Sequence, residues 1–194
     1  MSKHLIKNYP TLACCGLDCG LCPRFHTEGS SKCPGCCGPN FLNKHPSCSI
    51  ITCCVKKKKL EVCAQCDEFP CSKLEKNLNT KYDSFLTYKK VQTNLEFIQK
   101  NGIEPFIEQQ KKRINLLEEI LRDFNEGRSK NFYCIAATLL PIKDLEKALV
   151  DANQKMKTDK VEQADIKNKS MILKEFLNNL ATSQEIELKL RKKK

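Results

Sequence analysis

Thirteen of the 14 cysteines in this 194-residue chain lie between Cys14 and Cys71, and the other is Cys134. A segment this short, rich in Pro and Gly and poor in large aliphatic side chains, cannot bury enough apolar surface to fold without a staple. The available staples are disulfides and bound metal. The first ten residues contain no apolar stretch typical of a secretion signal, so we expect a cytoplasmic protein. In a reducing compartment, clustered thiols more often bind metal than form disulfides.

The spacing of these cysteines is typical of metal ligands. Three pairs are separated by two residues, which lets a tight turn direct both sulfurs at one ion, as in tetrahedral zinc knuckles. The predicted metal ligands are the ten cysteines that fit the regular spacing: Cys15, Cys19, Cys22, Cys33, Cys36, Cys48, Cys53, Cys63, Cys66 and Cys71. Ten thiols suffice for two four-cysteine sites with two thiols left over, or for sites that a histidine completes. The sequence does not fix how they pair.

Three of the predicted ligands have a second cysteine as their neighbour in the chain. Neighbouring residues rarely both reach one ion without strain, so we expect one member of each doublet to be a packing residue. The members outside the regular spacing are Cys14, Cys37 and Cys54. Two of the three histidines, His26 and His45, lie in the same segment and could each complete a site. We expect them to have surface or supporting roles, because the thiols already suffice.

Zinc is the predicted metal, because structural zinc sites favour paired knuckles in small, loop-rich modules. The alternative is a [4Fe–4S] cluster, since four cysteines serve iron as well as zinc. Cys15, Cys19 and Cys22 have the spacing with which radical S-adenosylmethionine enzymes hold such a cluster. Those enzymes place the motif in a large α/β barrel, for which this chain is too short and too helical.

The cysteine motifs resemble those of a cysteine-rich family found largely in anaerobic archaea and bacteria. The resemblance covers about residues 12–76 and is carried by Cys15-Gly-Leu-Asp-Cys-Gly-Leu-Cys-Pro23, Cys33-Pro-Gly-Cys36, Cys48-Ser-Ile-Ile-Thr-Cys53 and Cys63-Ala-Gln-Cys-Asp-Glu-Phe-Pro-Cys71. Members carry a domain of unknown function and are usually labelled zinc-binding proteins. The segment from Asn131 to Pro141 also looks like part of longer members. The resemblance implies metal binding by the ten regular cysteines and no assigned catalytic activity.

After about residue 80 the sequence pattern becomes helical. Apolar side chains recur at three- and four-residue steps over residues 85–98, 107–124 and 142–156, and residues 131–140 form a short apolar stretch before Pro141. Asp159, with Glu162 three residues on, predicts the start of the next helix. A last segment is expected from about residue 182. The predicted architecture is mainly α: a cysteine-rich metal-binding module of short helices and knuckles (1–76), followed by a helical bundle (77–194).

Charge and motifs exclude several functions but select none. The formal net charge is +11, yet the only compact internal basic run, Lys56–Lys59, lacks interleaved aromatic residues. Nucleic acid, bound by an adaptor protein, is therefore a possible partner that we do not favour, and a protein partner is possible. No apolar span is long enough to cross a membrane. No nucleotide-binding, metalloprotease or nucleophile motif is present, so we expect a binding role rather than an enzyme. Cys134 is expected to be a buried small side chain.

Overall fold

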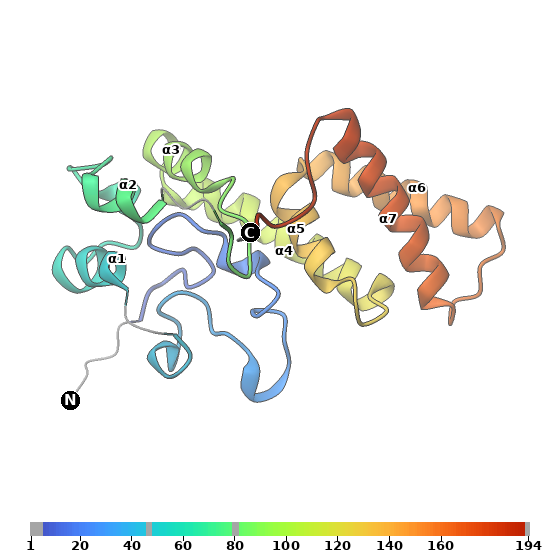
Figure 1. The fold of residues 1–194 in the computed structure, drawn as a ribbon, viewed down its shortest axis with the longest axis horizontal. Coiled ribbons are helices and arrows are strands. Elements are labelled where there is room, and N and C mark those ends of the chain that lie inside the picture. Colours follow the sequence, from blue (N-terminus) through green and yellow to red (C-terminus); the bar gives the residue numbers. More distant parts are fainter. Residues whose placement is uncertain (1–5, 46–47, 79–81, 193–194) are drawn as a thin grey trace. The chain divides into compact units, whose positions relative to one another are not determined.

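The computed structural model describes residues 6–45, 48–78 and 82–192, and every regular element in these ranges is a helix or helical turn (Figure 1). The short turns are η1 (Cys19–Leu21), η2 (Gly29–Ser31), η3 (Phe41–Asn43), η4 (Thr52–Lys57) and η5 (Cys63–Gln65). The α-helices are α1 (Ser49–Ile51), α2 (Ser72–Leu78), α3 (Val91–Asn101), α4 (Ile103–Phe124), α5 (Lys130–Leu139), α6 (Ile142–Thr158) and α7 (Ile166–Ser183). The predicted fold class, short helices and knuckles followed by longer helices, is confirmed.

The chain packs as two compact units. Unit 1 contains residues 1–111 and 191–194, and unit 2 contains residues 112–190. The boundary between the two falls inside α4. The predicted division at residue 76 follows a change in composition and stays a prediction. In the described part of the chain, no helix is both long and apolar enough to cross a membrane.

Unit 1 combines the cysteine-rich module with the apolar faces of α3 and the first turns of α4. Leu12 and Val62, from the module, are fully buried beside Leu95 and Ile98 of α3 and Ile103 of α4. Four buried cysteines also belong to this core, and the neighbouring helices add aliphatic surface to the small amount that the module supplies.

Polar side chains fix the loop of the first cysteines to these two helices. The side chain of Gln110, on α4, accepts from the Thr11 hydroxyl at 2.6 Å and donates to the Asp18 carboxylate at 2.5 Å. Asn94, on α3, donates to the carbonyl of Gly16 at 3.0 Å. All of these bonds hold residues 11–18, which contain the first cysteine doublet, in one conformation.

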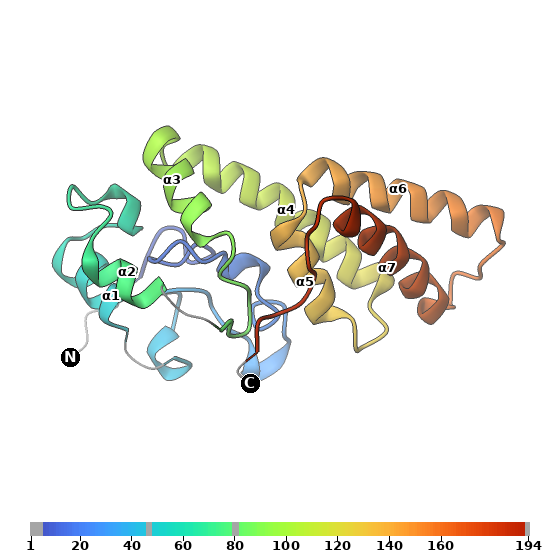
Figure 2. The same ribbon diagram turned by 45° about the horizontal axis from the view of Figure 1, so that its top comes forward.

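Unit 2 is built from the remainder of α4 with α5, α6 and α7, and α6 and α7 lie side by side (Figures 1 and 2). The apolar repeats predict α4 to α6 closely. The predicted start of the last helix is wrong: Asp159 follows the end of α6, and α7 begins after Asp165, whose carboxylate accepts from the Asn168 N–H at 2.9 Å. The segment expected from residue 182 is not a helix, because α7 ends at Ser183 and residues 186–192 are irregular.

Candidate metal centre

The structure separates the clustered cysteines into groups around a small pocket, a large cavity and a buried centre. All 14 cysteines are free of disulfides. The small pocket has a volume of about 30 Å³, and the large cavity has a volume of about 440 Å³. Both belong to unit 1.

Four of the predicted ligands surround the small pocket, together with Cys54: these are Cys53, Cys63, Cys66 and Cys71. Cys63 and Cys66 form a knuckle around η5, in which the Cys66 N–H donates to the Cys63 carbonyl at 3.0 Å. The side-chain oxygen of Gln65 accepts from the backbone N–H groups of Glu61 and Val62, which fixes the entry to this turn. The pocket exceeds the roughly 10–15 Å³ that a cavity needs to hold one water molecule, so it has room for a small group such as one ion.

Lys58 brings a positive charge to the same pocket. Its ammonium donates to the Cys66 sulfur at 3.1 Å and to the Glu68 carboxylate at 2.7 Å. The hydrogen bond to Glu68 raises the pKa of Lys58 most, and the hydrogen bond to Cys66 raises it further. Lys58 belongs to the basic run Lys56–Lys59. At least one cation of that run therefore contacts a cysteine of the small pocket.

The other six predicted ligands line the large cavity, together with Cys14: these are Cys15, Cys19, Cys22, Cys33, Cys36 and Cys48. The thiols of Cys15, Cys22 and Cys33 all act electrostatically on Cys19. Burial, with the neighbouring thiols, raises the pKa of Cys19 well above its usual value, and burial raises the pKa of Cys15 to about 11. These two thiols are therefore protonated at neutral pH, and a metal must displace their protons.

Both histidines of the module support this group. The Nε2 atom of His45 lies 3.2 Å from the Cys33 sulfur, and its ring stacks on Phe41 with a centroid separation of 4.7 Å. Burial, with the nearby Arg24, lowers the pKa of His45 and favours the neutral ring. His26 bonds the Gly20 carbonyl at 2.7 Å, inside the turn between Cys19 and Cys22. His45 thus has a ring nitrogen at the thiols, whereas His26 orients a knuckle.

The pair Cys33/Cys36 does not form a knuckle like the other two pairs. The Cys36 N–H donates to the Pro10 carbonyl at 2.7 Å instead of to Cys33. Gly35, between them, has a φ of +82°, and a Cβ atom there would lie 2.3 Å from the Pro10 oxygen. As a result the Cys33 sulfur faces His45, while the Cys36 sulfur lies 3.9 Å from that of Cys14.

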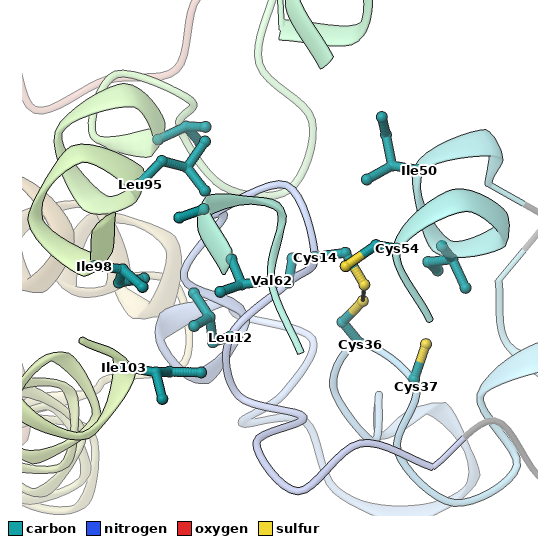
Figure 3. Close-up of a cluster of buried hydrophobic side chains, with 14 of the residues drawn as sticks. Leu12, Cys14, Cys36, Cys37, Ile50, Cys54, Val62, Leu95, Ile98 and Ile103 are labelled. Atoms are coloured by element: carbon teal, nitrogen blue, oxygen red, sulfur yellow. Dashed lines mark hydrogen bonds between the residues drawn. The ribbon is translucent and has the colours of Figure 1, made fainter. Parts of the chain in front are cut away.

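The three extra members of the doublets meet Cys36 in a buried thiol cluster, formed by Cys14, Cys36, Cys37 and Cys54 (Figure 3). The sulfur atoms of Cys14, Cys36 and Cys37 all lie within 4.8 Å of one another. Hydrogen bonds from Cys36, then Cys37 and Cys54, lower the pKa of Cys14, and the same contacts raise the pKa values of its partners. The spacing of the cysteines predicted Cys36 as a ligand, but it did not predict that Cys36 meets the extra cysteines of the doublets. The repetition of the doublets was the sequence feature that pointed to such a cluster.

Two further features contain none of the clustered cysteines. An open hollow of about 540 Å³ contains no cysteine and is lined by Glu75, Lys76, Leu78, Tyr88, Val91 and Gln92. Cys134 is fully buried in α5, in unit 2. The predicted thiol chemistry therefore concentrates in the small pocket, the large cavity and the buried thiol cluster.

Comparison with known proteins agrees with the resemblance over the cysteine-rich module. Residues 11–76 match the model of a family described as "Protein of unknown function (DUF3795)". The matched segment contains all thirteen clustered cysteines, and the description of the family assigns neither a metal nor an activity. No curated protein and no solved structure matches the chain.

Proposed function

We propose that this chain is a thiolate metalloprotein in which the small pocket binds a structural zinc ion. The observation that supports this proposal best is the small pocket itself, where four regularly spaced cysteines surround a volume suited to one ion. A tetrahedral site with four cysteines is one of the usual forms of a closed structural zinc centre. Its ligands span Cys53 to Cys71, so one ion would join η4, η5 and the start of α2.

Charge also supports a metal in the small pocket. Four thiolates and one Zn²⁺ leave a net charge of about −2. The Lys58 ammonium, which donates to the Cys66 sulfur, offsets part of that charge. A positive donor to a ligand sulfur is the kind of outer contact that stabilises metal-bound thiolates.

The large cavity supports a second candidate, an iron–sulfur centre held by Cys15, Cys19, Cys22 and Cys33. A single ion with metal–sulfur distances of about 2.3 Å brings its ligand sulfurs within about 3.8 Å of one another and leaves no cavity. The space lined by these cysteines is more than ten times that of the small pocket, which favours a polynuclear group. Arg24 and Lys44 also line it and would stabilise an anionic cluster or its ligand.

Elemental analysis of the full chain, purified without oxygen, tests both parts. We expect about one zinc per chain from the small pocket, together with iron, acid-labile sulfide and broad visible absorbance from the large cavity. A Cys66→Ser/Cys71→Ser variant should lose zinc and keep its colour, and a Cys19→Ser/Cys22→Ser variant should do the reverse. Cys134→Ser is the matched control. Zinc content unchanged in the first variant would refute the structural site, and colourless, iron-free wild-type protein would refute the cluster.

A further inference from the structure

The buried thiol cluster has no place among the two centres proposed above. Its members come from two loops and from η4 and are almost fully buried, with exposed fractions of 1% for Cys14, 6% for Cys36, 0% for Cys37 and 3% for Cys54. One buried cysteine is an ordinary small apolar side chain. Three buried sulfurs gathered around a fourth, that of Cys14, are different, because thiols are weak hydrogen-bond partners and gain little from one another.

We propose that Cys14, Cys36, Cys37 and Cys54 form a third metal site, which takes a thiophilic closed-shell cation, Zn²⁺ or Cu⁺. The proposal goes beyond the two centres above, because three of its four ligands lie outside the regular cysteine pattern. Thiolates select these soft cations over hard ones, and the cluster offers sulfur alone.

The separation of the sulfurs suits one ion. Tetrahedral ligands at about 2.3 Å from a zinc ion lie about 3.8 Å apart. The sulfurs of Cys14 and Cys36 are 3.9 Å apart, and Cys37 completes a triangle whose sides do not exceed 4.8 Å. The Cys54 thiol contacts that of Cys14, and in Figure 3 the two sulfurs lie side by side.

The backbone is held in an unusual conformation to make this arrangement. Cys37 has a φ of +59°, a left-handed conformation that costs an L-residue about 1–2 kcal/mol. The neighbouring Gly35 also has a positive φ. Strained backbone of this kind concentrates at functional sites, where the surrounding structure enforces it. Here it directs two neighbouring thiols, Cys36 and Cys37, toward Cys14 (Figure 3).

A buried cation lies next to the cluster. The side chain of Lys7 is 4% exposed, its ammonium donates to the Leu12 carbonyl at 2.5 Å, and its backbone N–H donates to the Cys37 carbonyl at 3.2 Å. Burying an ammonium is costly unless negative charge accompanies it. A four-thiolate site carries a net charge of about −2 with Zn²⁺, which supplies that negative charge.

The first test uses the unaltered full chain. Apoprotein saturated with ¹¹³Cd²⁺, a probe for thiolate sites, should give a cadmium resonance from the buried cluster in addition to those of the other two groups, and therefore at least three in the four-thiolate region. Loss of every resonance when the small-pocket ligands (Cys66→Ser/Cys71→Ser) and the large-cavity ligands (Cys19→Ser/Cys22→Ser) are both replaced would overturn the proposal. In a Cys66→Ser/Cys71→Ser variant the small-pocket resonance alone should disappear, so failure of that site is distinguishable from failure of this one.

The second test removes the cluster and keeps the regular ligands outside it. A Cys14→Ala/Cys37→Ala/Cys54→Ala variant retains all ten regularly spaced cysteines, and Cys134→Ala is its matched control. Native mass spectrometry after loading with Zn²⁺, or with Cu⁺ buffered by a competing chelator, should show one equivalent less of the preferred cation in the triple variant and no loss in the control. An unchanged capacity for both cations would refute the third site. Far-UV circular dichroism verifies folding, and the cadmium experiment stands if the triple variant does not fold.

Discussion

Replacing Gly35 with alanine should weaken metal binding far more than the same change at Gly29. Both glycines lie in the cysteine-rich module and both have a positive φ, +82° and +67°. A left-handed alanine costs about 1–2 kcal/mol at either position. The two differ in their surroundings: a Cβ atom at Gly29 meets nothing within 4 Å, whereas at Gly35 it meets the Pro10 oxygen at 2.3 Å.

The extra cost at Gly35 follows from that contact. Moving the Pro10 carbonyl away breaks its hydrogen bond with the Cys36 N–H, which is 2.7 Å long. A buried N–H left without a partner costs about 1–3 kcal/mol. We therefore expect Gly35→Ala to be less stable than Gly29→Ala by about 2 kcal/mol. Because metal binding and folding are coupled, this corresponds to about a thirtyfold loss of apparent affinity.

The assay is competition between each variant and a chromophoric chelator for Zn²⁺, paired with urea unfolding of the metal-loaded protein. Gly29→Ala reports the cost of backbone conformation alone, and the difference between the two variants reports the contact with Pro10. Equal affinities for the two variants would refute the inference that Gly35 is needed to place the Cys36 thiol.

Three further predictions concern the two units. Removing metal with a chelator should abolish hydrogen-exchange protection in the cysteine-rich module and leave it intact in unit 2; equal loss in both would contradict metal-dependent folding of the module. Gln110→Leu should lower the free energy of unfolding of unit 1 by about 1.5–3 kcal/mol, since a charge-assisted bond to a buried carboxylate is lost, whereas the exposed neighbour Gln109→Leu should change it little. Burial opposes ionisation of Glu126, but bonds from Ser129 and other donors lower its pKa to about 2. The stabilisation that ionised Glu126 contributes is thus present above the unfolded pKa near 4.5 and is lost as the pH falls toward 2. Glu126→Gln should therefore lower the free energy of unfolding at pH 7 by about 1–2 kcal/mol. It should also make the free energy of unfolding depend less steeply on pH between about 4.5 and 2.

The helices were predictable because their apolar periodicity is strong. The repeats over residues 107–124 and 142–156 lie within α4 and α6. The start of α7 was missed because Asp159 and Asp165 carry equally good capping side chains, and only the packing of the chain selects the second. The prediction that Phe85 lies on the apolar face of the first helix is wrong, because α3 begins only at Val91. Phe85 is 54% exposed, and the Arg24 guanidinium lies 4.8 Å from the centre of its ring.

The ligand pattern was predictable in kind but not in arrangement. Spacing identified Cys63 and Cys66 as a knuckle, because two intervening residues suffice to set that turn. Spacing could not separate Cys33 from Cys36, since their different directions depend on a contact with Pro10, which is distant in sequence. The meeting of Cys14 with Cys54 depends on tertiary packing in the same way.

The doublets make neighbouring thiol groups share one stretch of backbone. Cys14 belongs to the buried cluster and Cys15 to the large cavity, while Cys53 lines the small pocket and Cys54 contacts Cys14. An ion that fixes one member of a doublet also fixes the position of the next residue, and so lowers the entropy lost when the adjacent group is filled. Loading would then be positively cooperative. Native mass spectra of partly loaded samples would be dominated by empty and full chains, with few molecules in between.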